Sequence, residues 1–145
     1  MINISGRYEL DREKSESLYS HMKALGCEEI AALASEKLQV TVDIIQTDTD
    51  LTIWQNSQLG DTKRVLFLRE ETIESDARKA SVTLTPTSIT IETTFPKGKL
   101  VDKRQYEEEG EMLMQVLELT VHGVPGTIKT RRFMKKVGPP EPTLN

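Results

Sequence analysis

The sequence predicts an all-β domain that carries a small helical lid. Apolar residues recur at helical spacing only within residues 14–37, and beyond Leu38 the spacing changes to a period of two. Segments with that period then recur about every ten residues, separated by tight turns. This pattern indicates an antiparallel meander, which closes as a barrel or packs as a sandwich. At 145 residues the chain is expected to form a single domain.

A short strand and a first helix open the chain. Residues 5–10 alternate as a strand, and residues 14–25 follow with helical spacing. Gly26 comes directly after this helix, where a glycine commonly ends a helix as its C′ residue. One apolar stripe is predicted along the helix, formed by Leu18, Met22 and Leu25.

A second short helix is predicted over residues 28–37. Acidic residues stand at its start and Lys37 at its end, as the helix dipole favours. Its predicted apolar stripe consists of Ile30, Leu33 and Ala34. Two short helices joined this closely form a helix-turn-helix hairpin.

Strands account for most of the remaining chain. They are predicted over residues 40–45, 51–54, 64–68, 80–85, 88–95, 99–107 and 111–122. Residues 70–78 are predicted to be a charged connection, and residues 108–110 a turn.

The last strand follows the turn at residues 124–126 and continues to Lys136. In a strand, Arg131 shares one face with Lys129 and Phe133, whereas Arg132 shares the other with Thr130 and Met134. If the sheet is closed, one of the two arginines must point inward, and an unpaired buried charge costs several kcal/mol. Alternation alone does not say which one.

Composition excludes several classes of protein. The net charge of −4 argues against a nucleic-acid partner. The single cysteine, Cys27, permits no internal disulfide, and no apolar leader follows Met1, so a cytoplasmic location is expected. His21 and His122 lack neighbours at metal-ligand spacing, so no metal site is expected. No phosphate loop or nucleophile motif is present, and neither a cofactor nor enzymatic activity is expected.

Three blocks of the sequence resemble the intracellular lipid-binding proteins of the calycin superfamily, which include the fatty-acid-binding and cellular retinoid-binding proteins. Residues 6–10 are similar to that family's first strand, and residues 19–26 to its first helix with a Met-Lys-Ala-Leu-Gly ending. Residues 130–133 resemble its terminal Thr-Arg-x-Tyr motif. The blocks occur in the family's order between about residues 3 and 137.

The resemblance implies a β-clam: an up-and-down barrel of about ten antiparallel strands, capped by the helix-turn-helix over residues 14–37. The barrel domain would span residues 1–137, and the proline-rich tail over residues 138–145 would be disordered. The implied function is that of a monomeric carrier without a cofactor, holding one or two hydrophobic ligands such as a long-chain fatty acid.

In such a barrel, an inward arginine of the last strand and a tyrosine two residues later hold the ligand carboxylate. Arg131 matches the arginine, and Phe133 takes the place of the tyrosine. A second arginine is expected in the strand over residues 99–107, where the direct match falls on Asp102 and a slip of two residues falls on Arg104. Either Asp102 pairs with Arg131, which favours a neutral ligand such as a retinoid or sterol, or Arg104 and Arg131 together hold a carboxylate.

Other candidate ligand contacts come from neighbouring elements. Gln115 and Leu117 lie on the inward face of the penultimate strand by the same resemblance, and Leu18 and Met22 of the first helix are candidates for contact with the ligand tail. Trp54 is a candidate cavity or core residue.

Two further possibilities follow from the altered site and from the lid. A barrel with Phe133 and Asp102 at these positions could have lost lipid binding and act through its surface as an interaction or stress-protective module. Lysines of the lid, such as Lys14 and Lys23, could bring it into transient contact with anionic membranes.

Overall fold

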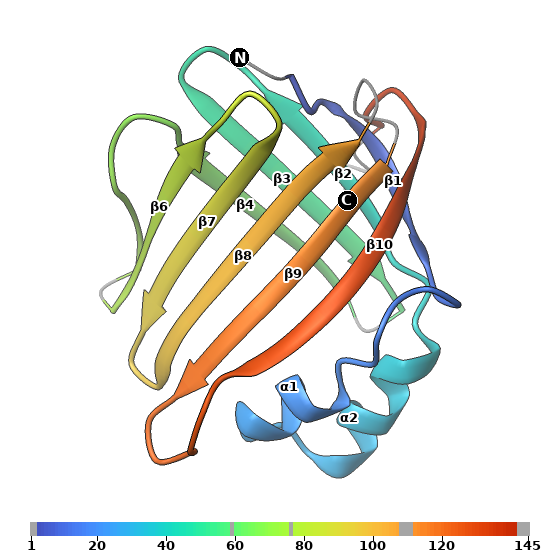
Figure 1. Ribbon diagram of the computed structural model, residues 1–145, viewed down its shortest axis with the longest axis vertical. Helices are drawn as coiled ribbons and strands as arrows, with labels where there is room; N and C mark the ends of the chain where they lie inside the picture. The colour runs from blue at the N-terminus through green and yellow to red at the C-terminus, as the bar shows by residue number, and fades with distance from the viewer. Residues whose placement is uncertain (1–2, 59, 76, 108–111, 142–145) are drawn as a thin grey trace.

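The computed structural model describes residues 3–58, 60–75, 77–107 and 112–141. Ten antiparallel strands form one sheet in the order β4-β3-β2-β1-β10-β9-β8-β7-β6-β5, which curls into a barrel (Figure 1). The strands are β1 (Gly6–Asp11), β2 (Thr41–Gln46), β3 (Asp50–Ser57), β4 (Gly60–Phe67), β5 (Thr72–Ser75), β6 (Arg78–Leu84), β7 (Ser88–Phe95), β8 (Gly98–Glu107), β9 (Met112–Val121) and β10 (Ile128–Gly138). This confirms the predicted lidded barrel.

Two short helices, α1 (Tyr19–Ala24) and α2 (Glu29–Ala34), lie between β1 and β2 and cover one end of the barrel (Figure 1). Both are shorter than predicted, and the last turn of the second is a 3₁₀ helix, Ser35–Lys37. Gly26 ends α1 as predicted: its φ is 84°, and its N–H donates to Lys23 O at 3.0 Å while Cys27 N–H donates to Met22 O. These two bonds form a Schellman motif. None of the described helices has the length and apolar character needed to span a bilayer.

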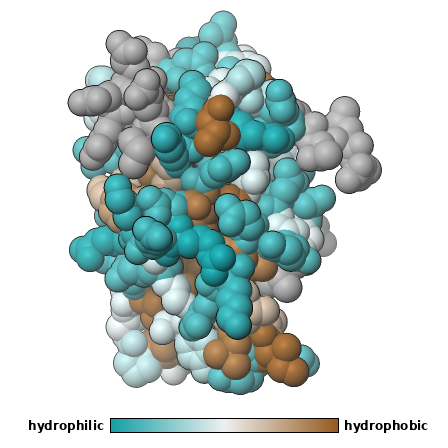
Figure 2. Space-filling view, turned by 90° about the vertical axis from the view of Figure 1, so that its right-hand side faces the viewer, coloured by the Kyte–Doolittle hydropathy of each residue, from teal (hydrophilic) through white to brown (hydrophobic). Residues whose placement is uncertain are grey.

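The predicted apolar stripe of α2 is wrong. Ile30 is 80% exposed and Leu33 50% exposed, whereas Ala32 is completely buried. The helix therefore buries its small alanine and leaves the larger side chains outside. Figure 2 shows a mainly hydrophilic face with scattered apolar side chains, including a group at its lower end, the end at which the helices lie in Figure 1.

Inward-facing residues alternate with outward-facing ones along most strands. The core gathers apolar side chains from both halves of the sheet, among them Tyr8, Ile44, Leu51, Ile91 and Leu113. Tyr8 and Tyr106 meet edge to face with ring centroids 6.1 Å apart.

The barrel is not closed by backbone pairing between β4 and β5, the two ends of the strand order. Side chains bridge this gap: Thr72 Oγ1 accepts a hydrogen bond from Phe67 N–H at 2.8 Å, and Arg64 Nε lies 2.7 Å from Glu74 Oε1. Strand β5 occupies part of the segment predicted to be a connection, because its four residues are too few to show a clear period. The predicted turn over residues 108–110 lies outside the described residues.

The start of the proline-rich tail contacts the outside of the barrel. Glu141 N–H donates to Asp43 Oδ1 at 2.9 Å, and Glu141 O accepts a hydrogen bond from Arg7 Nη2. Asp43 is fully buried and also pairs with Arg7 Nε at 2.9 Å. Gly138 belongs to β10, and residues 142–145 lie outside the described part of the chain. Disorder of the tail therefore remains a prediction.

Candidate functional site

The inward-facing arginine of β10 is Arg132, not Arg131. Arg132 is 4% exposed, and its neighbours on the same face, Thr130 and Met134, are equally buried. Arg131 is exposed and Phe133 is only half-buried. The prediction that Arg131 and Phe133 enter the cavity is therefore wrong. Two adjacent arginines fit the Thr-Arg-x-aromatic pattern almost equally well, and only the register of β10 distinguishes them.

That register is set partly by the segment before α1. Arg131 N–H donates to Glu16 Oε1 at 2.7 Å, and Phe133 N–H donates to Ser15 Oγ at 2.9 Å. On the other edge of β10, Arg132 stands opposite Gln115 of β9. Gln115 in turn stands opposite Arg104 of β8. Arg104, Gln115 and Arg132 thus form one row across three neighbouring strands, facing the interior.

Asp102 and Arg104 both face the interior and pair with each other. Arg104 Nη2 lies 3.0 Å from Asp102 Oδ2, and its Nε lies 3.2 Å from Oδ1. Burial alone would lower the pKa of Arg104, but the Asp102 carboxylate raises it above its ordinary value. The expected choice between Asp102 and Arg104 therefore does not arise. A pairing of Asp102 with Arg131 is excluded, because Arg131 lies on the outer face.

Arg132 has no such partner: within the described chain, its guanidinium makes no hydrogen bond or ion pair. Burial, and then the charge of Arg104, lower the pKa of Arg132 to about 10, with Asp102 opposing this shift. Arg132 is still protonated at neutral pH. Two arginines and one carboxylate therefore leave this part of the interior with one uncompensated positive charge.

His21 reaches the same region from the lid. It is 8% exposed, and its Nδ1 is buried without a hydrogen-bond partner among the described residues. Burial, and then the charge of Arg132, lower the pKa of His21. From the sequence, we considered His21 only as a metal ligand. Its position three residues after Leu18, next to the predicted stripe, was the available signal that it faces the barrel.

These side chains line an internal cavity of about 230 Å³. Its polar lining includes His21, Asp102, Arg104, Gln115 and Arg132, and its apolar lining consists of Leu18, Ile53, Leu100 and Leu117. Gln115 and Leu117 face inward, as predicted from the family resemblance. Met22 is half-buried and does not line the cavity. Trp54 lies beside Lys63, whose Nζ is 5.2 Å from the ring centroid, and is also absent from the lining.

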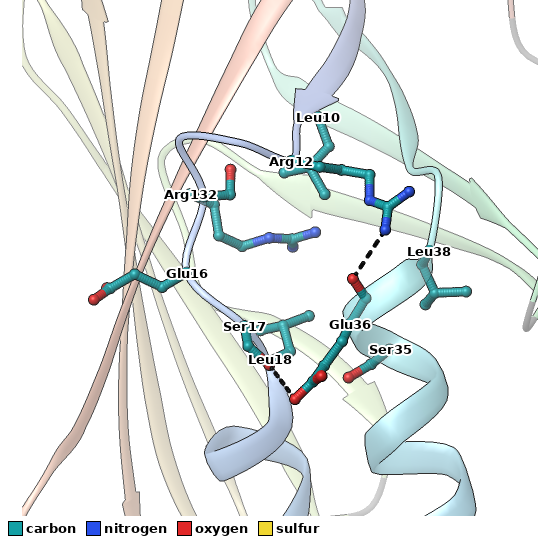
Figure 3. Close-up of a pocket in the computed structure, with 10 residues that line it drawn as sticks. Leu10, Arg12, Glu16, Ser17, Leu18, Ser35, Glu36, Leu38 and Arg132 are labelled. Atoms are coloured by element: carbon teal, nitrogen blue, oxygen red, sulfur yellow. Dashed lines mark hydrogen bonds between the residues drawn. The ribbon is translucent and has the colours of Figure 1, made fainter.

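A second cavity, of about 210 Å³, lies between β1, the segment before α1 and the end of α2 (Figure 3). Arg132 and Leu18 line both cavities, and the Arg132 side chain points into the second one. Around it, Arg12 donates to Glu36 O at 3.2 Å and Ser17 donates to Glu36 Oε1 at 3.3 Å. Arg132 therefore lies where the interior meets the edge of the lid.

A wider groove of about 760 Å³ follows the gap between β4 and β5. Thr62 and Arg64 line both this groove and the internal cavity. The groove also carries exposed apolar side chains, Val65, Phe67 and Ile73. No group of three or more His, Cys, Asp or Glu side chains within the described ranges could hold a metal ion.

Comparison with known proteins places the fold. No family model matches the sequence, and no curated protein matches it. Solved structures do match. Lipid binding protein 8 of Caenorhabditis elegans gives a TM-score of 0.77 at 19% identity, over 94% of this chain and 99% of that one. Human cRBP IV gives a TM-score of 0.76 at 20% identity, over 94% of this chain and 100% of that one.

A fatty-acid-binding protein of Schistosoma mansoni, solved with arachidonic acid, gives a TM-score of 0.74 at 18% identity, over 93% of this chain and 96% of that one. The chain thus has the β-clam fold of these proteins over nearly its whole length. At such identities the likeness establishes the fold.

Proposed function

We propose that the protein is a carrier that holds a long-chain carboxylic acid inside the barrel, with the carboxylate on Arg132. The observation that carries this proposal is the unpaired, buried guanidinium of Arg132. An uncompensated charge at such a position costs several kcal/mol, and a bound carboxylate would supply the missing partner through charge-assisted hydrogen bonds. Arg104 Nη1, which is also buried without a partner among the described residues, offers a further donor.

The apolar lining of the cavity suits the first part of an acyl chain. The cavity volume of about 230 Å³ is below the roughly 300–1,000 Å³ that is typical of small-molecule sites. A long chain therefore needs more room, and the direction that offers it passes Thr62 and Arg64 toward the groove between β4 and β5. The fold neighbours that carry lipids support the same function, and we assign the site no catalytic step.

Displacement of a fluorescent fatty acid by hexadecanoic acid or by hexadecanol tests the proposal. The wild type should bind the acid at least about tenfold more tightly than the alcohol, since hydrogen bonds to charged groups contribute roughly 1.5–3 kcal/mol. Arg132→Met should lose this preference and keep its affinity for the alcohol. Arg131→Met is the matched control and should behave as the wild type, because Arg131 is exposed.

Equal losses of affinity for the acid and for the alcohol in Arg132→Met would contradict the role of Arg132 in binding the carboxylate. The proposed carrier function would be refuted if the wild type showed no displacement and no lipid adduct in native mass spectrometry. That result would favour a barrel that acts through its surface.

A further inference from the structure

The orientation of the Gln115 amide is determined by its contact with Asp102. Gln115 is 4% exposed, and its Nε2 donates to Asp102 Oδ1 at 3.0 Å. An ionised carboxylate only accepts hydrogen bonds, so the amide nitrogen must be the atom that faces it. The amide oxygen therefore points elsewhere. Gln115 Oε1 is buried and has no hydrogen-bond partner among the described residues.

This oxygen is an open acceptor on the wall of the ligand cavity. Gln115 stands between Arg104 and Arg132 in the inward-facing row, yet neither guanidinium donates to it in the structure. Arg104 is held by Asp102 instead. A buried acceptor without a donor destabilises the ligand-free protein. The site thus combines a free cation with a free acceptor.

A simple fatty acid complements only half of this arrangement. Its carboxylate offers acceptors, which suit Arg132 but leave Gln115 Oε1 without a donor. A hydroxyl group can donate to Gln115 Oε1 and also accept a hydrogen bond. The buried Nδ1 of His21 lines the same cavity without a partner and offers a second contact for such a group.

We propose that the preferred ligand is a long-chain carboxylic acid that carries a hydroxyl group close to the carboxylate, with the hydroxyl bound by Gln115 Oε1. This inference rests on the proposed function, because it takes the carboxylate to lie on Arg132. Gln115 and Arg132 are direct cross-strand neighbours, and the Cβ atoms of such pairs lie about 4.5–5.5 Å apart. A hydroxyl on the second or third carbon of the acid would match that spacing.

The test compares four acids of equal chain length by displacement of a fluorescent fatty acid: hexadecanoic acid and its derivatives hydroxylated at the second, the third or the terminal carbon. The wild type should bind the better of the second- and third-carbon derivatives about tenfold more tightly than hexadecanoic acid, the effect of one hydrogen bond to an otherwise unpaired buried acceptor. The terminal hydroxyl should give no gain.

Gln115→Met should abolish this preference and bind the simple and hydroxylated acids equally. Gln105→Met is the matched control, because Gln105 lies on the exposed face of β8 next to Arg104, and it should keep the preference. Equal affinity of the wild type for all four acids would overturn the inference and leave the carrier function intact. A failure of all four acids to bind would refute the proposed function and this inference together.

Discussion

Replacing Arg132 by methionine should make the protein more stable while removing its preference for acids. Folding takes this guanidinium out of water without giving it a partner, which is why its pKa falls from its ordinary value to about 10. Each pKa unit corresponds to roughly 1.4 kcal/mol, so this fall means that the charged guanidinium lowers the free energy of unfolding by about 3 kcal/mol at neutral pH. Methionine retains an unbranched apolar stem of similar length, so packing against Leu10 and Leu18 should largely remain.

The sign of the effect follows from proton binding. Between about pH 10 and the higher pKa of an ordinary arginine, the unfolded chain holds a proton at Arg132 that the folded chain has lost. The penalty is therefore fully present below this window and disappears above it. At pH 7, Arg132→Met should therefore raise the free energy of unfolding by about 1–3 kcal/mol, and the melting temperature by roughly 3–10 °C.

Urea unfolding of delipidated protein, with melting curves from circular dichroism, measures both quantities. Arg131→Met serves as the control and should shift neither, because its side chain is exposed. A variant Arg132→Met that is less stable than the wild type would refute the reasoning, since it would show that the guanidinium has stabilising partners in the folded, ligand-free protein. Added hexadecanoic acid should stabilise the wild type more than this variant, because the variant binds the acid more weakly.

Two further predictions concern His21 and the contact between Arg7 and the tail. Burial, and then the charge of Arg132, lower the pKa of His21. The free energy of unfolding should therefore not depend on His21 above pH 6.5, the ordinary pKa of histidine, and should fall as the pH drops below it. His21→Gln should flatten that fall in urea unfolding between about pH 6.5 and 5, and an unchanged slope would show that other groups cause it. Arg7→Met leaves the fully buried Asp43 without its cation and should cost about 2–4 kcal/mol by the same assay. Arg78→Met removes an exposed cation from Glu74, which keeps its ion pair with Arg64, and should cost less than about 1 kcal/mol. Similar losses in the two variants would argue against a special role for Asp43.

The sequence predicted those parts of the fold that depend on local signals. Gly26 ends α1 because a positive φ favours glycine wherever the helix lies, and the strand order follows from short turns between consecutive strands. The orientation of α2 was predicted wrongly because its helical spacing allows more than one buried face. Which face is buried depends on how α2 packs in the assembled fold, where Ala32 is completely buried.

The sequence predicted some of the residues that line the cavity, but not the arginine that enters it. Asp102, Arg104 and Gln115 face inward because a period of two places them there once the strands are known. Arg132 was missed because the choice between two adjacent arginines depends on the pairing of β10 with β9 and on backbone contacts from Ser15 and Glu16. These contacts join segments that are far apart in the sequence, so no local pattern contains them.

The ion pair between Asp102 and Arg104 determines how many charges the cavity offers. Without the carboxylate, Arg104 and Arg132 would leave two uncompensated positive charges, an arrangement that suits a dianion better than a simple acid. Asp102 neutralises one of them through two nitrogen atoms of Arg104 and at the same time orients the amide of Gln115. One side chain therefore sets both properties that we use to infer the ligand: a single free positive charge on Arg132 and an acceptor at Gln115 Oε1. If the ligand is the one proposed, the same carboxylate gives the site its selectivity for one negative charge and one hydroxyl group.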